Sequence, residues 1–314
     1  MGSSNSLVTE FKESMMNMFE MTDLGLLNYF LGLEIKQGED GVFVFQKKYA
    51  EDLLKRFNMT NCRAAVTPMN MNEKLQLKDG TEEADAVSFR SLVGGLIYLT
   101  HTRPDIAFAV GMVSRFMHNP TRQHFGAAKR ILRYIAGTQN FGIWYSNVAD
   151  FELVGFTDSD WAGSVDDRRS TSGFVFNLGS GAVTWSSKKQ GVTALSTAEA
   201  EYVAATSSAC QGVWLRRLLA DFEQEQKEAT GIFCDNQSAV AIAKNPVMHG
   251  RTKHIDIKFH FIRDLINEGV ISFKFCSSLE NLADIFTKSL SSEKHVKFRN
   301  MLGVCNYESR GSVE

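Results

Sequence analysis

The spacing of apolar residues changes near the middle of the chain. In the first half, apolar residues recur every three to four positions, the interval of an amphipathic helix. This spacing predicts helices over residues 7–21, 47–57, 89–100, 103–118 and 122–135. Alternating apolar residues predict a β-hairpin over residues 29–45 and a short strand over residues 142–145. The first half is therefore predicted to be mainly helical, with one β-hairpin.

After residue 146, short apolar runs alternate with longer helical stretches. Five strands are predicted, and they close near residues 158, 176, 185, 234 and 275. Helices are predicted over residues 197–222, 237–244, 256–267, 282–290 and 293–302. This order implies one mixed sheet, antiparallel through its first hairpins and parallel afterwards, with helices packed on its faces. The second half is therefore predicted to be an α/β domain.

Composition supports a globular chain of about two domains. Of its 314 residues, 44% are hydrophobic and 22% are charged. We expect a first region over residues 1–146, an α/β domain over residues 147–290, and a C-terminal helix and tail over residues 291–314. A domain of ~150 residues buries roughly 70% of its unfolded surface, so neither half needs a disulfide or a metal in order to fold.

The cysteines and the apolar runs indicate in which cellular compartment the protein is expected. The five cysteines stand singly, without a Cys-x-x-Cys pair, at positions 62, 210, 234, 276 and 305. This pattern argues against a disulfide framework and a zinc site, and it favours a reducing compartment, either cytoplasm or nucleus. Uninterrupted apolar runs of 18 residues do not occur in the sequence, so we expect no membrane partner.

Four acidic residues stand where separate segments would deliver them to one point. Asp158 and Asp235 each close an apolar run, and the carboxyl ends of strands in an open α/β sheet meet in one crevice. Glu201 opens one helical stretch, and Asp284 lies at the start of another. Carboxylates ~4 Å apart repel by roughly 4 kcal/mol per pair at an effective dielectric of ~20. Divalent cations would offset this repulsion, and a two-metal carboxylate site carries out phosphoryl transfer.

Two neighbouring acids compete for these roles. Asp158 lies on the same side of its strand as Phe156, whereas Asp160 is expected in the turn beyond it. Glu199 and Glu201 are two positions apart on a helix, so only one of them can face the crevice. Glu199 suits the N-terminus of the helix, where a carboxylate complements the helix dipole. We therefore expect Asp158 and Glu201 at the site.

Basic residues gather in the first half, although the net charge of the chain is −2. Residues 101–134 carry six Arg or Lys against a single acid, Asp105. Such a zone can follow a phosphate backbone, and a solvated helix face would give the same pattern. If the zone binds nucleic acid, the expected contacts are Arg115, Lys129, Arg130, Arg133, Asn236, Gln237 and Lys253.

Six short motifs together resemble the ribonuclease H domain at the C-terminal end of Pol polyproteins from copia-type LTR retrotransposons. They occupy residues 155–163, 166–173, 196–202, 234–237, 253–256 and 281–284. Each motif alone is weak, but six in this order at family-like spacing are specific. Residues 21–32 and 103–106 resemble the end of the reverse transcriptase that precedes this domain, so the likeness covers nearly the whole chain.

This resemblance implies a ribonuclease H-like, mixed five-stranded sheet with flanking helices, after a region like the late palm, thumb and connection of a reverse transcriptase. It implies cleavage of the RNA strand of RNA–DNA hybrids with two Mg²⁺ ions, which Mn²⁺ could replace. The family's metal ligands fall on Asp158, Glu201, Asp235 and Asp284. The upstream polymerase portion of the same polyprotein is an expected partner, and no small-molecule cofactor is expected.

Polymerase activity is not expected from this chain. The family places the required aromatic-x-Asp-Asp turn upstream of Met1. The Asp-Asp pair at residues 166–167 has Ser164 where the aromatic residue should stand. The loop over residues 276–280 also lacks the histidine that many ribonuclease H relatives carry before the last aspartate, so Glu280 or water would have to replace it.

Two other functions fit the same sequence. The chain could be a catalytically inactive retroelement fragment or a nucleic-acid-binding module, although the complete carboxylate set argues against simple decay. It could also be an integrase-like nuclease on the same fold. That class usually places a final glutamate on a late helix, where this chain has Asp284.

Overall fold

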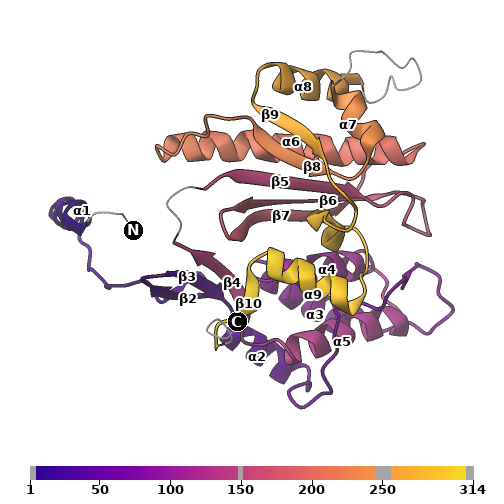
Figure 1. Ribbon diagram of the computed structural model, residues 1–314. Helices are drawn as coiled ribbons and strands as arrows, with labels where there is room; N and C mark the ends of the chain where they lie inside the picture. Colours follow the sequence, from indigo (N-terminus) through magenta and orange to yellow (C-terminus); the bar gives the residue numbers. More distant parts are fainter. Residues whose placement is uncertain (1–4, 148–150, 245–255, 309–314) are drawn as a thin grey trace.

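The computed structural model describes residues 5–147, 151–244 and 256–308 of the chain, without the side chains of 256–259. Two five-stranded sheets organise these residues, and the first sheet takes four strands from the first half of the sequence and one from the C-terminal end. Figure 1 shows the helices of residues 47–136 below the second sheet, and a long helix on the opposite side of that sheet. Among the described helices, none is long and apolar enough to cross a membrane.

The first half is mainly helical, as predicted. Its helices are α1 (Asn5–Met18), α2 (Lys47–Arg56), α3 (Ala86–Leu99), α4 (Ala107–Ser114) and α5 (Arg122–Ala136). Asp85 caps α3 by accepting a hydrogen bond from the Val87 amide at 2.9 Å. The Thr121 hydroxyl and the His124 ring form a capping box at the start of α5. Side chains placed just before α3 and α5 therefore fix where these two helices begin.

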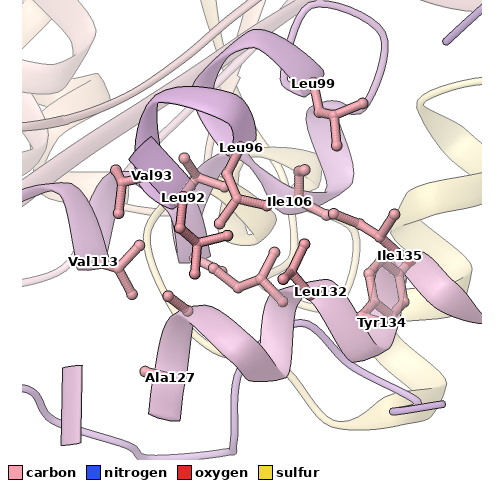
Figure 2. Close-up of a cluster of buried hydrophobic side chains, with 14 of the residues drawn as sticks. Leu92, Val93, Leu96, Leu99, Ile106, Val113, Ala127, Leu132, Tyr134 and Ile135 are labelled. Atoms are coloured by element: carbon pink, nitrogen blue, oxygen red, sulfur yellow. The ribbon is translucent and has the colours of Figure 1, made fainter. Parts of the chain in front are cut away.

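The core of the first half lies between α2, α3, α4 and α5. Figure 2 shows Leu92, Val93 and Leu96 of α3 facing Leu132 and Ile135 of α5. These side chains are almost completely buried. In contrast, α1 has no buried residue, and it lies apart from the rest of the molecule in Figure 1.

One predicted helix of this half is shorter than expected. The range 103–118 contains a 3-10 turn, η1 (Pro104–Ile106), followed by α4, which ends at Ser114. The Ser114 hydroxyl donates to the carbonyl of Gly111 at 2.8 Å. Such a local side-chain bond competes with continuation of the helix, so the predicted four further residues are not helical.

The first sheet is antiparallel throughout, in the order β1-β2-β3-β4-β10. Its strands are β1 (Tyr29–Phe30), β2 (Leu33–Gly38), β3 (Gly41–Phe45), β4 (Phe141–Ser146) and β10 (Val304–Asn306). The predicted hairpin is β2–β3, which turns between Gly38 and Gly41. The last strand comes from the far end of the chain, and no pattern predicted it because three residues carry no readable period.

The second half forms the predicted mixed sheet, in the order β7-β6-β5-β8-β9. Its strands are β5 (Leu153–Ser159), β6 (Thr171–Leu178), β7 (Gly181–Lys189), β8 (Thr230–Cys234) and β9 (Ile271–Phe275). Pairing is antiparallel for β5–β6 and β6–β7, and parallel for β5–β8 and β8–β9. The long helix α6 (Thr197–Asp221) covers one face, with α7 (Gln237–Lys244) and α8 (Asp256–Asn267) beside it.

The C-terminal segment returns to the first half. After β9 come a 3-10 turn, η3 (Leu282–Phe286), and then α9 (Ser292–Met301) and β10. The expected helix over residues 282–290 was therefore wrong. The turn is tight because the amides of both Thr287 and Lys288 bond to the Asp284 carbonyl, and the chain then leaves the helical path. A third apolar cluster, which includes Ile143, Val175 and Phe298, joins the two halves.

Candidate metal centre

Three of the four predicted acids meet at one end of the central strands. The parallel pair β5–β8 sets Phe156 opposite Phe233, so Asp158 and Asp235, each two residues further along, reach the same edge. Asp284 arrives from η3, which packs against β5 and β6. Carboxylate oxygens of Asp158, Asp235 and Asp284 all lie within 4.8 Å of one another. The convergence expected from the strand ends is present in the structure.

Glu201 completes the group from the first turns of α6. One of its carboxylate oxygens lies within 4.8 Å of ligand atoms of both Asp235 and Cys234. Glu199 has a different role, because its carboxylate accepts a hydrogen bond from the Leu195 amide at 2.9 Å. The Ser196 hydroxyl accepts from the Glu199 amide at 3.2 Å and so caps the helix. The helix thus uses one glutamate as a cap and turns the other towards the aspartates.

The neighbouring Asp160 is also excluded from the group. Its carboxylate accepts a hydrogen bond from the Thr171 amide, which fixes the turn after β5. Burial raises the pKa of Asp160, and this hydrogen bond opposes the effect. Asp160 therefore holds the turn after β5, where it was expected.

Asn281 holds the last aspartate in place. Its side chain is fully buried and donates to the carbonyl of Thr157 at 3.1 Å, one residue before Asp158. Its carbonyl oxygen accepts from the Ala283 amide at 3.2 Å and so caps η3. Thr287, at the end of the turn, donates its hydroxyl hydrogen to Asp158. These contacts tie η3 to β5 and set the distance between Asp158 and Asp284.

Two lysines approach the same carboxylates. Lys288 Nζ lies 2.7 Å from one oxygen of Asp284 and 3.6 Å from Asp158. Lys294 Nζ lies 2.6 Å from the other oxygen of Asp284. The contact between Lys288 and Asp284 Oδ1 lacks hydrogen-bond geometry, so this buried oxygen has no hydrogen-bond donor in the described part of the chain.

Burial and mutual repulsion dominate the electrostatics. Burial raises the pKa of Asp158, and the Asp284 charge adds to it, while Lys288 opposes both. Burial also raises the pKa of Glu201, reinforced by Asp158 and Asp235. Burial alone would lower the pKa of Lys288, but the carboxylates of Asp158 and Asp284 outweigh it and raise that pKa. The carboxylates thus carry unfavourable negative charge that additional positive charge would stabilise.

The donor set suits a hard divalent cation. Aspartate and glutamate oxygens are the protein ligands that Mg²⁺ and Mn²⁺ prefer. Asp284 Oδ1 is buried, and its partner is the Lys288 ammonium at 2.7 Å, an ion pair without hydrogen-bond geometry. Cys234 is a poor ligand here, because burial raises the pKa of its thiol and keeps it protonated. The thiol instead donates to Glu201 at 3.8 Å.

The predicted nucleic-acid contacts lie in several different settings. Three arginines are engaged within the protein: Arg115 donates to Thr171 (3.0 Å), Arg130 to Thr67 (3.1 Å) and Arg133 to the Arg63 carbonyl (2.8 Å). The Asn236 side chain accepts from the Ala239 amide at 3.0 Å, at the start of α7. Lys129 and Gln237 are exposed, and Lys253 lies outside the described residues. Nucleic-acid binding by these residues stays a prediction.

Several residues of this centre did not emerge from the sequence analysis. Asn281, Thr287, Lys288 and Lys294 all contact the acids or hold them. Lys288 follows Asp284 by four residues, the spacing of a side-chain pair on one helical turn, and that spacing could have pointed to it. The position of Lys294 depends on how α9 packs, which no local pattern encodes.

The mixed five-stranded sheet, with acids gathered at the carboxyl ends of its central strands, is the arrangement that the resemblance to ribonuclease H predicted. The N-terminal ribonuclease H domain of a Mycobacterium tuberculosis protein superposes with a TM-score of 0.34 and 14% identity, over 48% of this chain and 96% of that domain. A family model described as reverse transcriptase (RNA-dependent DNA polymerase) matches residues 1–71.

Several sequence relatives are transposon proteins. The retrovirus-related Pol polyprotein from transposon RE1 of Arabidopsis thaliana is 39% identical over 303 residues, which cover 96% of this chain and 21% of the relative. The putative transposon Ty5-1 protein of Saccharomyces cerevisiae is 30% identical, over 65% of this chain and 68% of that protein. The chain belongs to the Pol family of copia-type LTR retrotransposons. It spans about a fifth of the length of the RE1 polyprotein.

Proposed function

We propose that the chain is the ribonuclease H portion of a retrotransposon reverse transcriptase and that it hydrolyses the RNA strand of RNA–DNA hybrids. The observation that carries this proposal is the approach of Asp158, Asp235 and Asp284 within 4.8 Å, with Glu201 beside Asp235. Four carboxylates brought together from separate segments repel one another unless positive charge lies near them. Nucleases with a two-metal site use such a group of carboxylates to hold divalent cations.

Each acid has a distinct place in the proposed site. Asp158, Asp235 and Asp284, whose oxygens lie within 4.8 Å of one another, would hold one cation, and Glu201 and Asp235 would hold the second. When bound, the pair of Mg²⁺ or Mn²⁺ ions would stabilise the attacking and leaving oxygens of the scissile phosphate. Thr287 and Asn281 keep the Asp158 and Asp284 carboxylates in position through the hydrogen bonds described above.

Recognition of the hybrid would rest on shape. An RNA-containing duplex presents 2′-hydroxyl groups across a wide, shallow minor groove, and contacts to these groups tell RNA from DNA without reading bases. Exposed Lys129 on α5 and Gln237 at the start of α7 are candidates for contacts with the backbone. The upstream polymerase portion of the polyprotein would add further duplex contacts that this chain does not contain.

A cleavage assay tests the proposal. The purified chain with Mg²⁺ should cut the RNA strand of a hybrid and leave duplex RNA and duplex DNA intact. Asp158→Asn should abolish cleavage while hybrid binding is retained or strengthened, because the repulsion between Asp158 and the substrate phosphate is removed. Asp221→Asn, at the exposed end of α6, is the matched control and should cut like the wild type.

The other two functions predict different results. A nucleic-acid-binding module would bind hybrid and release no product at any Mg²⁺ or Mn²⁺ concentration. An integrase-like nuclease would cut duplex DNA. Either result would refute the ribonuclease H assignment, and so would loss of hybrid binding together with cleavage in Asp158→Asn.

A further inference from the structure

Lys288 reaches the acidic cluster from the surface. Its side chain is 44% exposed, whereas the carboxylates of Asp158 and Asp284 that it meets are 2% and 0% exposed. The ammonium lies between them, 3.6 Å from Asp158 Oδ2 and 2.7 Å from Asp284 Oδ1. Its positive charge therefore stands where the two buried negative charges come closest to solvent.

Lys294 is held differently, although it binds the same aspartate. Besides its 2.6 Å contact with Asp284, Lys294 donates to the Ser278 carbonyl at 2.8 Å and lies 5.2 Å from the ring centroid of Phe298. In the described part of the chain, the ammonium of Lys288 has carboxylates alone as partners. The Lys288 side chain can therefore move away from the acids without breaking a hydrogen bond to any other group. Movement of Lys294 would break its hydrogen bond to the Ser278 carbonyl.

The position of the Lys288 ammonium conflicts with a cation on the same oxygens. Mg²⁺ sits 2.0–2.1 Å from its oxygen ligands, in near-octahedral geometry. An ion held by both Asp158 and Asp284 would share these two carboxylates with the Lys288 ammonium. Two positive charges on one pair of carboxylates repel each other strongly in a buried setting.

We propose that Lys288 is an internal competitor for the divalent cation at the Asp158–Asp284 edge. The lysine pairs with the two carboxylates when no ion is bound, and its side chain moves out to solvent when an ion binds. It thereby stabilises the ion-free fold and weakens cation binding, so it sets how readily the ion is released. This inference rests on the metal site of the proposed function and adds a residue that controls occupancy of that site.

The first test uses variants and needs no substrate. Lys288→Gln removes the charge and should bind Mg²⁺ at least about fivefold more tightly, since coupling between two ligands of one protein is commonly 5- to 150-fold. The same variant should melt at a lower temperature in chelator, and its melting temperature should rise more than that of the wild type on addition of Mg²⁺. Lys288→Arg keeps the charge and should restore wild-type affinity. Lys297→Gln is the control, because Lys297 donates to the Leu279 carbonyl and not to the cluster.

The second test uses the wild-type protein and so does not depend on folding of a variant. Amines can be labelled with an acetylating reagent and each lysine can be quantified by mass spectrometry. Labelling of Lys288 should increase severalfold when Mg²⁺ is added, because the ammonium is then released to solvent. Lys297 should label equally with and without the ion.

Each outcome decides the inference separately from the proposed function. Unchanged or weaker Mg²⁺ affinity in Lys288→Gln, or labelling of Lys288 that Mg²⁺ leaves unchanged or lowers, would overturn it. A wild-type chain that cleaves hybrids, with Lys288→Gln binding Mg²⁺ like the wild type, would leave the ribonuclease H proposal standing and reject the competitor. A chain that never cleaves hybrids, with tighter ion binding in Lys288→Gln, would do the reverse.

Discussion

The side-chain amide of Asn281 donates to the main-chain carbonyl of Thr157 across 124 residues of sequence, at 3.1 Å. This hydrogen bond joins the turn that carries Asp284 to the strand that carries Asp158. Asn281 is fully buried, and it helps to set the distance between the two catalytic candidates from within the protein. Asn281 is a positioning residue of the proposed centre.

Replacing Asn281 should harm both stability and activity. In Asn281→Ala the Thr157 carbonyl loses its donor from the side chain and η3 loses its cap, so the free energy of unfolding should fall by about 1–3 kcal/mol. Urea unfolding measures this loss. Asn281→Asp keeps the acceptor that caps η3 but sets a buried carboxylate against the Thr157 carbonyl and beside the acids, so it should lose at least as much stability as alanine. An alanine variant as stable and as active as the wild type would contradict the positioning role.

Glu199 and Glu201 should differ sharply in activity. Substitutions of residues that merely support metal ligands commonly cost 10- to 100-fold, so Glu201→Gln should reduce hybrid cleavage by more than about 100-fold. Glu199→Gln keeps an acceptor for the Leu195 amide and should cleave at nearly the wild-type rate. Initial rates at saturating Mg²⁺ test this pair. Equal losses in both variants would show that the assignment of the two glutamates is incorrect.

Gly173 permits close contact between η3 and the sheet. A Cβ atom at this position of β6 would lie 2.7 Å from Thr287 Cγ2 and 2.8 Å from Phe286 Cβ. Gly173→Ala should therefore push η3 outwards, at a cost of about 1–3 kcal/mol from overpacking. Mg²⁺ affinity should weaken as Thr287 withdraws from Asp158. Gly126→Ala is the control, because a Cβ there meets no atom within 4 Å, and its stability should be unchanged or slightly higher.

His295 should make stability depend on pH. The ring is buried on α9, its Nε2 donates to the Asp105 carbonyl at 3.1 Å, and its edge meets Tyr134. Burial lowers the pKa of His295 below its ordinary value, Asp105 opposes this effect, and Arg299 and Arg103 add to it. The unfolded chain therefore takes up the proton first. The stability that neutral His295 contributes is complete above the unfolded pKa and is lost as pH falls below it.

A glutamine variant separates the contribution of His295 to the pH dependence of stability from that of the other groups. The stability advantage of wild type over His295→Gln should be larger at about pH 7.5 than at about pH 5.5, since the glutamine side chain does not titrate. Thermal unfolding at both pH values measures the difference. His101→Gln, at an exposed position, should retain the wild-type slope. A difference between wild type and His295→Gln that stays constant with pH would contradict the prediction.

The spacing of apolar residues predicted those helices and strands that are long enough to show a period. The period of two over residues 153–159 and the period near 3.6 over residues 197–221 are visible in sequence, so the elements of the second half were predicted closely. The ends of β5 and β8 placed Asp158 and Asp235 together without coordinates, because parallel neighbours share an edge. The tight turn η3 and the strand β10 were mispredicted or missed, since each is too short to show a period.

The sequence by itself determined the order and type of most elements and the four acids at the centre, because periodicity and strand ends are properties of neighbouring residues. Tertiary structure alone decided what surrounds those acids. The bond from Thr287 to Asp158 spans 129 residues, and Lys288 and Lys294 reach Asp284 only once η3 and α9 have packed on the sheet. Contacts between segments far apart in the chain depend on the three-dimensional path of the backbone, which no local window of sequence records.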